Sequence, residues 1–219
     1  MSDTLPLTYR YEGPGKPGPQ DPLVLLLHGY GSHENDLLNL VPALPEKRHY
    51  VSLRAPQALG FGGFAWYALA MEDGRIRTGD PAEAKQALEQ VHQFVAQYRE
   101  QEGLTAAPLQ LVGFSQGAIL SYAYALHYPR EVAQVAALSG YVLKDIVPSQ
   151  YRPEDLRHLR FFVSHGTADE VIPVQAARQT VSFLEKLGVS HVYREYPEGH
   201  GIAPDNLRDL QNWYEEKPA

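Results

Sequence analysis

The stretch Leu109-Gln-Leu-Val-Gly113-Phe114-Ser115-Gln116-Gly117-Ala118 decides the fold of this chain. Its apolar beginning predicts a strand over residues 109–112, and the Ala-, Leu- and Tyr-rich segment 116–127 predicts a helix. One serine between two glycines leaves a very tight turn to join them. We expect Ser115 to adopt a strained backbone conformation there, because Gly113 and Gly117 supply room that side chains would fill. Its hydroxyl is then exposed at the edge of a sheet.

Short apolar strands alternate with helices along the rest of the chain. The unbroken apolar run 23–27 is typical of a strand buried on both faces. Asp80, Pro81 and Glu83 mark the start of a long helix that ends before Gly103. Further strands are expected at residues 8–12, 49–53, 132–138, 161–164 and 191–196, and further helices at 174–187 and 203–215. The alternation predicts a single α/β domain over residues 1–219, with a central, mostly parallel sheet covered by helices on both faces.

Composition narrows the classes of protein. The 219 residues suffice for one domain with a full core, and the net charge of −7 argues against a nucleic-acid partner. The chain has no cysteine, which excludes disulfides, a thiol nucleophile and cysteine zinc sites. Its longest apolar run is too short to span a bilayer, and Met1-Ser-Asp-Thr-Leu-Pro6 does not resemble a secretory signal. We therefore expect a cytoplasmic protein with no integral membrane segment.

Polar residues follow four of the predicted strands, where the carboxyl ends of parallel strands bring reactive groups together. Ser115 follows the predicted strand 109–112, and His200 follows the last strand, 191–196. Asp169 follows the strand 161–164, in the segment His165-Gly-Thr-Ala-Asp169. The segment His28-Gly-Tyr30-Gly31 follows the strand 23–27. The order Ser, Asp, His is that of α/β-hydrolases and differs from the other well-known serine triads.

Each of these residues has a chemical role in such a triad. A serine hydroxyl attacks a carbonyl only while a base removes its proton, and His200 is the candidate base. Asp169 would fix the imidazole tautomer and stabilise the imidazolium. The backbone N–H groups of Gln116 and Tyr30 would bind the oxyanion of the tetrahedral intermediate.

The motifs Leu27-His-Gly-Tyr-Gly31, Gly113-Phe-Ser-Gln-Gly117, His165-Gly-Thr-Ala-Asp169 with Val171-Ile-Pro173, and Gly199-His200 resemble those of the phospholipase/carboxylesterase family of α/β-hydrolases. The resemblance runs from about Leu23 to the C-terminus. It implies Ser115, Asp169 and His200 as catalytic residues, Tyr30 and Gln116 as oxyanion donors, and hydrolysis without metal or cofactor. Because members of that family are often dimers, the resemblance also suggests a homodimer.

The chain departs from the thioesterase members of that family. Ala118 stands where they usually have a second glycine, and Trp66-Tyr67-Ala68 replaces their Trp-Phe-Asp pattern. The hypothesis is therefore a serine carboxylesterase that hydrolyses small to medium acyl esters through an acyl-enzyme. Alternatives are an acyl thioesterase or lysophospholipase on the same machinery, or a catalytically silent binding protein.

Other residues compete for these roles. Glu170 is the rival of Asp169, and His191 is the rival of His200. We expect His28 and His165 to hold their turns by hydrogen bonds. The residues His33, Glu34 and Asp36 match no metal-site spacing, and a solvated helix start is the simpler interpretation.

A substrate pocket is expected beside Ser115. Aromatic residues gather in a glycine-rich loop that core packing or a pocket could use: Phe61, Phe64, Trp66 and Tyr67. Phe64 and Trp66 are the candidates for the pocket, with Leu143, Val171 and Ile172 on the opposite wall. Residues 141–159 offer the only room for a cap, which predicts a minimal cap and an open site.

Overall fold

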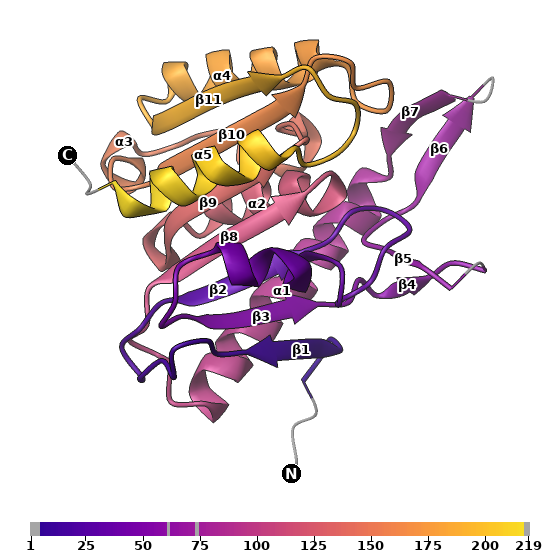
Figure 1. Ribbon diagram of the computed structural model, residues 1–219. Helices are drawn as coiled ribbons and strands as arrows, with labels where there is room; N and C mark the ends of the chain where they lie inside the picture. Colours follow the sequence, from indigo (N-terminus) through magenta and orange to yellow (C-terminus); the bar gives the residue numbers. More distant parts are fainter. Residues whose placement is uncertain (1–4, 61, 73–74, 217–219) are drawn as a thin grey trace.

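A seven-stranded sheet forms the centre of the molecule, in the order β1-β3-β2-β8-β9-β10-β11 (Figure 1). This computed structural model describes residues 5–60, 62–72 and 75–216. The strands are β1 (Tyr9–Glu12), β2 (Leu23–Leu27), β3 (His49–Leu53), β8 (Leu109–Phe114), β9 (Val132–Leu138), β10 (Arg160–Gly166) and β11 (Ser190–Tyr196). Only β1, at the edge, pairs antiparallel, and the other six strands are parallel. The mostly parallel sheet predicted from the sequence is confirmed.

Helices cover both faces of this sheet. Along β2, alternate side chains enter two separate apolar clusters, with Leu25 in one and Leu26 in the other. The first cluster includes residues of α1 (Pro81–Gln101), α2 (Gln116–His127) and α4 (Val174–Lys186), and the second includes residues of η1 (Leu37–Ala43) and α5 (Pro204–Glu215). Figure 1 shows α5 in front of the sheet and α2 behind it. Because both faces are covered, the central strand β2 is apolar throughout rather than alternating.

The strands β8 and β10 extend two residues further at their carboxyl ends than the sequence predicts. Their last residues are Phe114 and Gly166, which pair with Leu138 of β9 and Tyr196 of β11. Polar or glycine residues at these ends weaken the sequence signal for a strand, but the backbone hydrogen bonds continue. Ser115 directly follows the extended β8, and His165 lies in the extension of β10.

The long helix α1 begins as predicted. The Asp80 carboxylate accepts hydrogen bonds from the N–H groups of Ala82 (2.8 Å) and Glu83 (3.1 Å). Glu83 does not close a capping box, because its carboxylate accepts the N–H of Ala68 at 2.7 Å instead. None of the helices in the described ranges is both long and apolar enough to cross a membrane.

The segment between β3 and α1 contains strands that the sequence does not predict. Two short antiparallel pairs form there: β4 (Gln57–Ala58) with β5 (Phe64–Ala65), and β6 (Leu69–Glu72) with β7 (Arg75–Gly79). The β6–β7 pair projects past the carboxyl ends of the central strands (Figure 1).

Three shorter helices complete the fold: η2 (Pro129–Glu131), η3 (Lys144–Ile146) and α3 (Pro153–Leu156). The latter two lie within the segment 141–159 that was expected to form the cap. Residues 1–4, on which the expectation of no secretory signal partly rests, lie outside the described residues, as does Phe61.

Candidate active site

The turn between β8 and α2 has the strained geometry that the sequence predicts. Ser115 has φ +54° and ψ −117°, a conformation that side-chain-bearing residues rarely adopt. A methyl group added to Gly113 would collide with the backbone of Gly117, and one added to Gly117 would collide with the Leu27 carbonyl. Ser115 is only 7% exposed, less than expected, because the surrounding loops cover it. Its hydroxyl faces a cavity rather than open solvent.

The structure brings Ser115, His200 and Asp169 together, although 85 and 31 positions separate the bonded pairs along the chain. Ser115 Oγ lies 2.9 Å from His200 Nε2, and His200 Nδ1 lies 2.6 Å from Asp169 Oδ2. Since a carboxylate can only accept, the Nδ1 atom carries the proton. The His200 Nε2 lone pair is then free to accept the serine proton.

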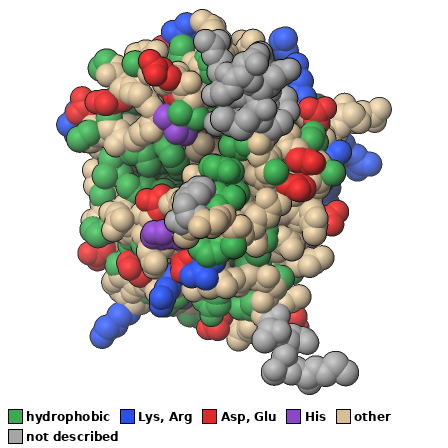
Figure 2. Space-filling model, turned by 90° about the vertical axis from the view of Figure 1, so that its right-hand side faces the viewer, with side chains coloured by type: hydrophobic (Ala, Val, Ile, Leu, Met, Phe, Trp, Pro, Cys, Tyr) green, Lys and Arg blue, Asp and Glu red, His purple; other side chains and the backbone are tan. Residues whose placement is uncertain are grey.

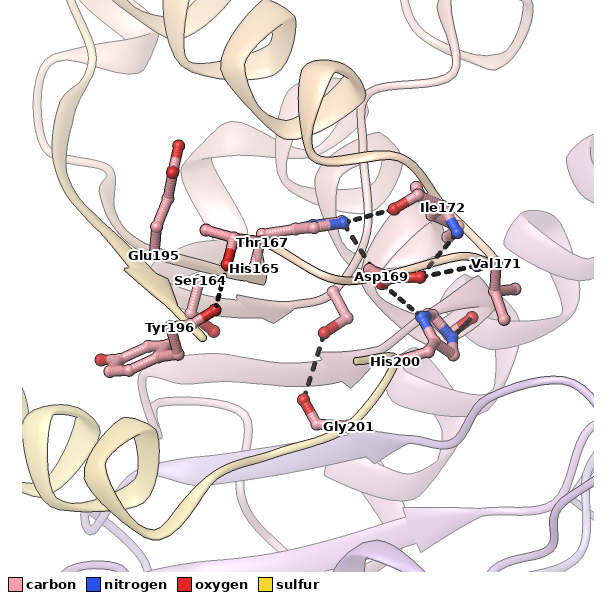
Figure 3. A network of polar contacts seen from close by, with 12 residues as sticks. Ser164, His165, Thr167, Asp169, Val171, Ile172, Glu195, Tyr196, His200 and Gly201 are labelled. Atoms are coloured by element: carbon pink, nitrogen blue, oxygen red, sulfur yellow. Dashed lines mark hydrogen bonds and ion pairs between the residues drawn. The ribbon is translucent and has the colours of Figure 1, made fainter. Parts of the chain in front are cut away.

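The Asp169 side chain is fully buried, and both of its oxygens have partners (Figure 3). Oδ1 accepts the backbone N–H groups of Val171 (2.9 Å) and Ile172 (2.8 Å), while Oδ2 faces His200. The rival Glu170 is exposed. These three contacts, two to one turn and one to an imidazole, fix the direction of the carboxylate.

The rival base His191 lies at the amino end of β11, whereas His200 follows the carboxyl end of the same strand. Its Nδ1–H donates to the Val189 carbonyl at 2.9 Å. The opposite ends of one strand therefore separate the two histidines, and His191 is remote from Ser115.

The loop after β2 packs directly against the serine turn. A methyl group on Gly29 would lie 3.3 Å from Ser115 Cβ, which shows how closely the two backbones approach. Tyr30 and Gln116 line the same cavity as Ser115 and His200. Gln116 is the first residue of α2, where a backbone N–H has no acceptor within the helix. The two backbones thus meet where an oxyanion would form.

His28 holds the loop after β2 in place, as expected. Its Nδ1–H donates to the Gly29 carbonyl at 2.7 Å, and Nε2 accepts the Ala55 N–H at 3.1 Å. Burial lowers the pKa of His28, which keeps the imidazole neutral and able to do both. The Gly29 carbonyl and the Tyr30 N–H belong to one peptide group, so this hydrogen bond also fixes the direction of that N–H.

A cavity of about 700 Å³ opens beside Ser115. Figure 2 shows hydrophobic side chains gathered in the middle of this face of the molecule. Three of the residues predicted for the pocket line it, namely Leu143, Val171 and Ile172. Tyr67, for which the sequence leaves core packing and a pocket open, also lines the cavity. Several further lining residues are not predicted from the sequence, among them Leu69, Gly79, Ile119 and Tyr141. The β6–β7 pair therefore supplies part of the wall, so residues 141–159 are not the only segment able to cover the site.

Phe64 and Trp66 are not among the residues that line this cavity, contrary to expectation. The Trp66 indole is buried, and its N–H donates to the His28 carbonyl at 2.8 Å. The Phe64 backbone pairs with the loop, through Gly31 N–H to Phe64 O at 2.9 Å and Phe64 N–H to Ser32 O at 2.8 Å. Both residues turn away from the cavity because they hold the loop that carries Tyr30.

The Gln116 side chain has a role that the motif alone does not reveal. Its Oε1 accepts the backbone N–H of Trp66 at 3.1 Å, and its Nε2 donates to the Tyr67 carbonyl at 2.8 Å. The same residue therefore contributes a backbone N–H to the site and clamps the segment from which the β6–β7 pair begins. A buried polar side chain inside an apolar helix start was the available signal.

The solvated helix start expected at residues 33–36 is wrong for Glu34. This carboxylate is 2% exposed and accepts the Arg54 Nε–H at 2.7 Å. That hydrogen bond lowers the pKa of Glu34 to about 2. Arg54 in turn lies 4.6 Å above the Phe64 ring. No group of three metal-ligating side chains gathers anywhere in the described residues.

Comparisons with known proteins match this architecture. The phospholipase/carboxylesterase family model matches residues 15–216. The carboxylesterase SOBER1 of Arabidopsis thaliana is 30% identical over 140 residues, which cover 63% of this chain but only 60% of that protein. Acyl-protein thioesterase 1 of Mycosarcoma maydis is 26% identical over 88% of this chain and 90% of its own length.

Solved structures agree on the fold. The crystal structure of esterase PE8 superposes with a TM-score of 0.79 at 28% identity, covering 95% of this chain and 98% of that one. A carboxylesterase from Mesorhizobium loti gives a TM-score of 0.80 at 24% identity, covering 99% and 98%. With the family model spanning nearly the whole chain, this protein belongs to the phospholipase/carboxylesterase family of the α/β-hydrolase fold.

Proposed function

We propose that this protein is a serine carboxylesterase that hydrolyses esters of small to medium carboxylic acids. One observation carries the proposal. His200 bridges Ser115 Oγ at 2.9 Å and Asp169 Oδ2 at 2.6 Å, at the wall of an apolar cavity of about 700 Å³. An alcohol, an oriented imidazole and room for an acyl group are what acyl transfer requires.

The reaction would proceed in two halves through an acyl-serine. Ser115 Oγ attacks the ester carbonyl while His200 Nε2 takes its proton, and the backbone N–H groups of Tyr30 and Gln116 face the resulting oxyanion. His200 then gives the proton to the departing alcohol, which leaves the acyl group on Ser115. Water repeats the sequence to release the acid. This route requires no metal or cofactor.

The cavity supports acyl groups of limited length. Its wall is mostly apolar, and its side chains come from several elements of the fold, including Ile119 of α2 and Leu143. We expect p-nitrophenyl esters of short and medium acids to be hydrolysed in preference to emulsified long-chain triglycerides. Equal rates on the long-chain lipid would contradict this part of the proposal.

The leaving group is a separate question, because relatives named carboxylesterase and relatives named thioesterase both match the chain. The side chains that line the cavity in the described residues include no lysine or arginine. Among these described side chains a lysophospholipid phosphate would find no cation, which favours an uncharged ester. An ester and a thioester with the same acyl chain and matched leaving groups, assayed side by side, would separate esterase from thioesterase.

The decisive experiment combines labelling and turnover. A fluorophosphonate probe should attach to Ser115 in the wild type, and Ser115→Ala should lose both the label and about 10⁶-fold in kcat. Ser190→Ala, an exposed serine at the start of β11, is the matched control and should behave as the wild type. If the folded wild type takes no label and hydrolyses no ester, the silent binding protein becomes the better interpretation.

Three further proposals concern the domain organisation, the cellular location and the oligomeric state. We propose that residues 1–219 act as one domain, that the enzyme works in the cytoplasm on small-molecule esters without a nucleic-acid partner, and that it forms a homodimer. Sedimentation velocity at micromolar concentration tests the dimer, and a monomer at all concentrations would exclude it.

A further inference from the structure

His165 is a buried histidine beside the catalytic acid, and the proposed mechanism does not use it. It is the penultimate residue of β10, and its side chain is fully buried. Its Nε2 lies 2.7 Å from the Ile172 carbonyl oxygen, so Nε2 must carry a proton that it donates there. Its Nδ1 has no hydrogen-bond partner in the part of the chain that the structure describes. Within the described residues, the Nε2–H group therefore makes every polar contact of this imidazole.

That N–H faces a second acceptor. His165 Nε2 lies 3.3 Å from Asp169 Oδ2, the same oxygen that accepts from His200 Nδ1 at 2.6 Å. Figure 3 shows the Asp169 carboxylate between the two imidazoles, with dashed lines to both. The carboxylate thus meets two N–H groups at each of its oxygens, because Oδ1 accepts from Val171 and Ile172.

These contacts form a closed circuit. His165 holds the Ile172 carbonyl, the Ile172 N–H holds Asp169 Oδ1, and Asp169 Oδ2 faces His165 again. The torsion that turns a carboxylate about its last bond has broad minima, so hydrogen bonds rather than rotamer preference must set its plane. Backbone N–H groups fix one oxygen, and His165 limits where the other can point.

We propose that His165 is a positioning residue that acts through Asp169. Its shared N–H holds the carboxylate in the plane in which Oδ2 meets His200, and it ties the turn 169–172 to β10. This inference rests on the proposed function only in taking Asp169 as the partner of the base. The competing interpretation is a histidine that merely fills the space under the turn and contributes to stability.

A double-mutant cycle separates the two interpretations. His165→Leu keeps the bulk of the side chain and removes the donor, and it is made both in the wild type and in Asp169→Asn. If His165 acts through the carboxylate, the substitution His165→Leu should lower kcat about tenfold in the wild type and less than twofold in Asp169→Asn, which lacks the carboxylate. Equal losses in the two backgrounds would overturn the proposal.

Two amide variants provide the rescue test in case His165→Leu does not fold. The amide nitrogen of His165→Gln reaches the position of Nε2, whereas that of His165→Asn reaches only the position of Nδ1. We expect Gln to recover most of kcat and Asn to behave as Leu does. A Gln variant no more active than the Asn variant would also overturn the proposal.

A spectroscopic readout makes the test independent of turnover. The short His200–Asp169 hydrogen bond should give a far-downfield proton resonance from Nδ1–H. The resonance should persist in the wild type and in His165→Gln, and should broaden or vanish in His165→Leu. A wild type that shows the resonance but hydrolyses no ester would reject the proposed function alone. An unchanged resonance in folded His165→Leu would reject the role of His165 alone.

His49 supplies the matched control. It is also buried, and its Nε2 lies 2.9 Å from the Gly18 carbonyl, but it stands at the start of β3, four strands away from β10 in the sheet. His49→Leu should destabilise the protein without changing the resonance. Any loss of kcat it causes should be the same with and without the Asp169 carboxylate.

Discussion

Two segments at the carboxyl ends of buried parallel strands flank Ser115, and each contains a His-Gly pair: His28-Gly29 follows β2, and His165-Gly166 ends β10. The acid side comprises residues 165–172 and His200, and the oxyanion side comprises residues 28–32 with the segment 64–66 that pairs with them. On the acid side the proposed mechanism uses a side chain, the carboxylate of Asp169. On the oxyanion side it uses a backbone group, the N–H of Tyr30. The chemistry of the acid side therefore depends on the residue type at position 169, whereas that of the oxyanion side depends on where the backbone of residue 30 lies.

The supports of the two sides differ accordingly. Around Asp169 the N–H groups of Val171, Ile172 and His200 point at the carboxylate itself, and His165 divides its N–H between the carboxylate and the Ile172 carbonyl. Around Tyr30 the donors point at carbonyls of the loop: His28 holds the Gly29 carbonyl, and Trp66 holds the His28 carbonyl. Substitutions on the acid side should consequently act on turnover directly, whereas those on the oxyanion side should act by allowing the backbone to shift.

The largest difference is expected for Asp169→Asn. The neutral amide can donate to His200, which would place the imidazole in the tautomer that cannot accept the serine proton. We expect kcat to fall about 10⁴-fold while the fold is kept. Steady-state kinetics on a short p-nitrophenyl ester checks this, with Glu170→Gln as the matched control, since that neighbouring carboxylate is exposed and should be dispensable.

On the oxyanion side, Trp66→Phe tests the indirect support. It removes the indole N–H that donates to the His28 carbonyl at 2.8 Å but keeps an aromatic ring in the core. We expect kcat to fall about tenfold, short of the roughly 100-fold or greater loss that follows removal of an oxyanion donor itself. KM should change little, because Trp66 does not line the cavity. A rise in KM with unchanged kcat would contradict this role and indicate that Trp66 contacts the substrate.

The smallest effect is expected for Glu34→Gln, and it concerns stability. The hydrogen bond from Arg54 holds the pKa of Glu34 at about 2, below its ordinary value of 4.5. A carboxylate whose pKa is depressed on folding contributes stability above its unfolded pKa and loses it as the pH falls toward its folded pKa. Glu34→Gln should therefore lose about 1–2 kcal/mol near pH 7, or about 2–8 °C in Tm.

The pH dependence of that difference is the sharper test. Melting curves of the wild type and of Glu34→Gln should converge between pH 4.5 and about pH 2. Over that interval the unfolded wild type takes up a proton on Glu34 while the folded wild type keeps the carboxylate ionised, so the contribution of the ion pair to stability disappears. A Tm difference that stays constant from pH 7 to pH 2 would show that the ion pair between Arg54 and Glu34 does not stabilise the fold.

The comparison also explains which predictions succeeded. The strands, the tight turn at Ser115 and the cap at Asp80 depend on local patterns of apolar, glycine and capping residues, and the structure confirms them. The pocket prediction failed for Phe64 and Trp66, because an aromatic residue in a loop can turn into the core or toward a cavity with the same local sequence. Only the hydrogen bonds to residues 28–32 decided the direction.

By itself the sequence determined the alternation of strands and helices, the strained serine turn and the order in which Ser115, Asp169 and His200 follow their strands. Tertiary structure alone decided that the β6–β7 pair walls the cavity, that Glu34 is buried against Arg54, and that His165 shares its proton with the acid. The physical reason is range: periodicity and turn chemistry act over a few residues, whereas these contacts join atoms whose proximity exists only after the sheet has assembled.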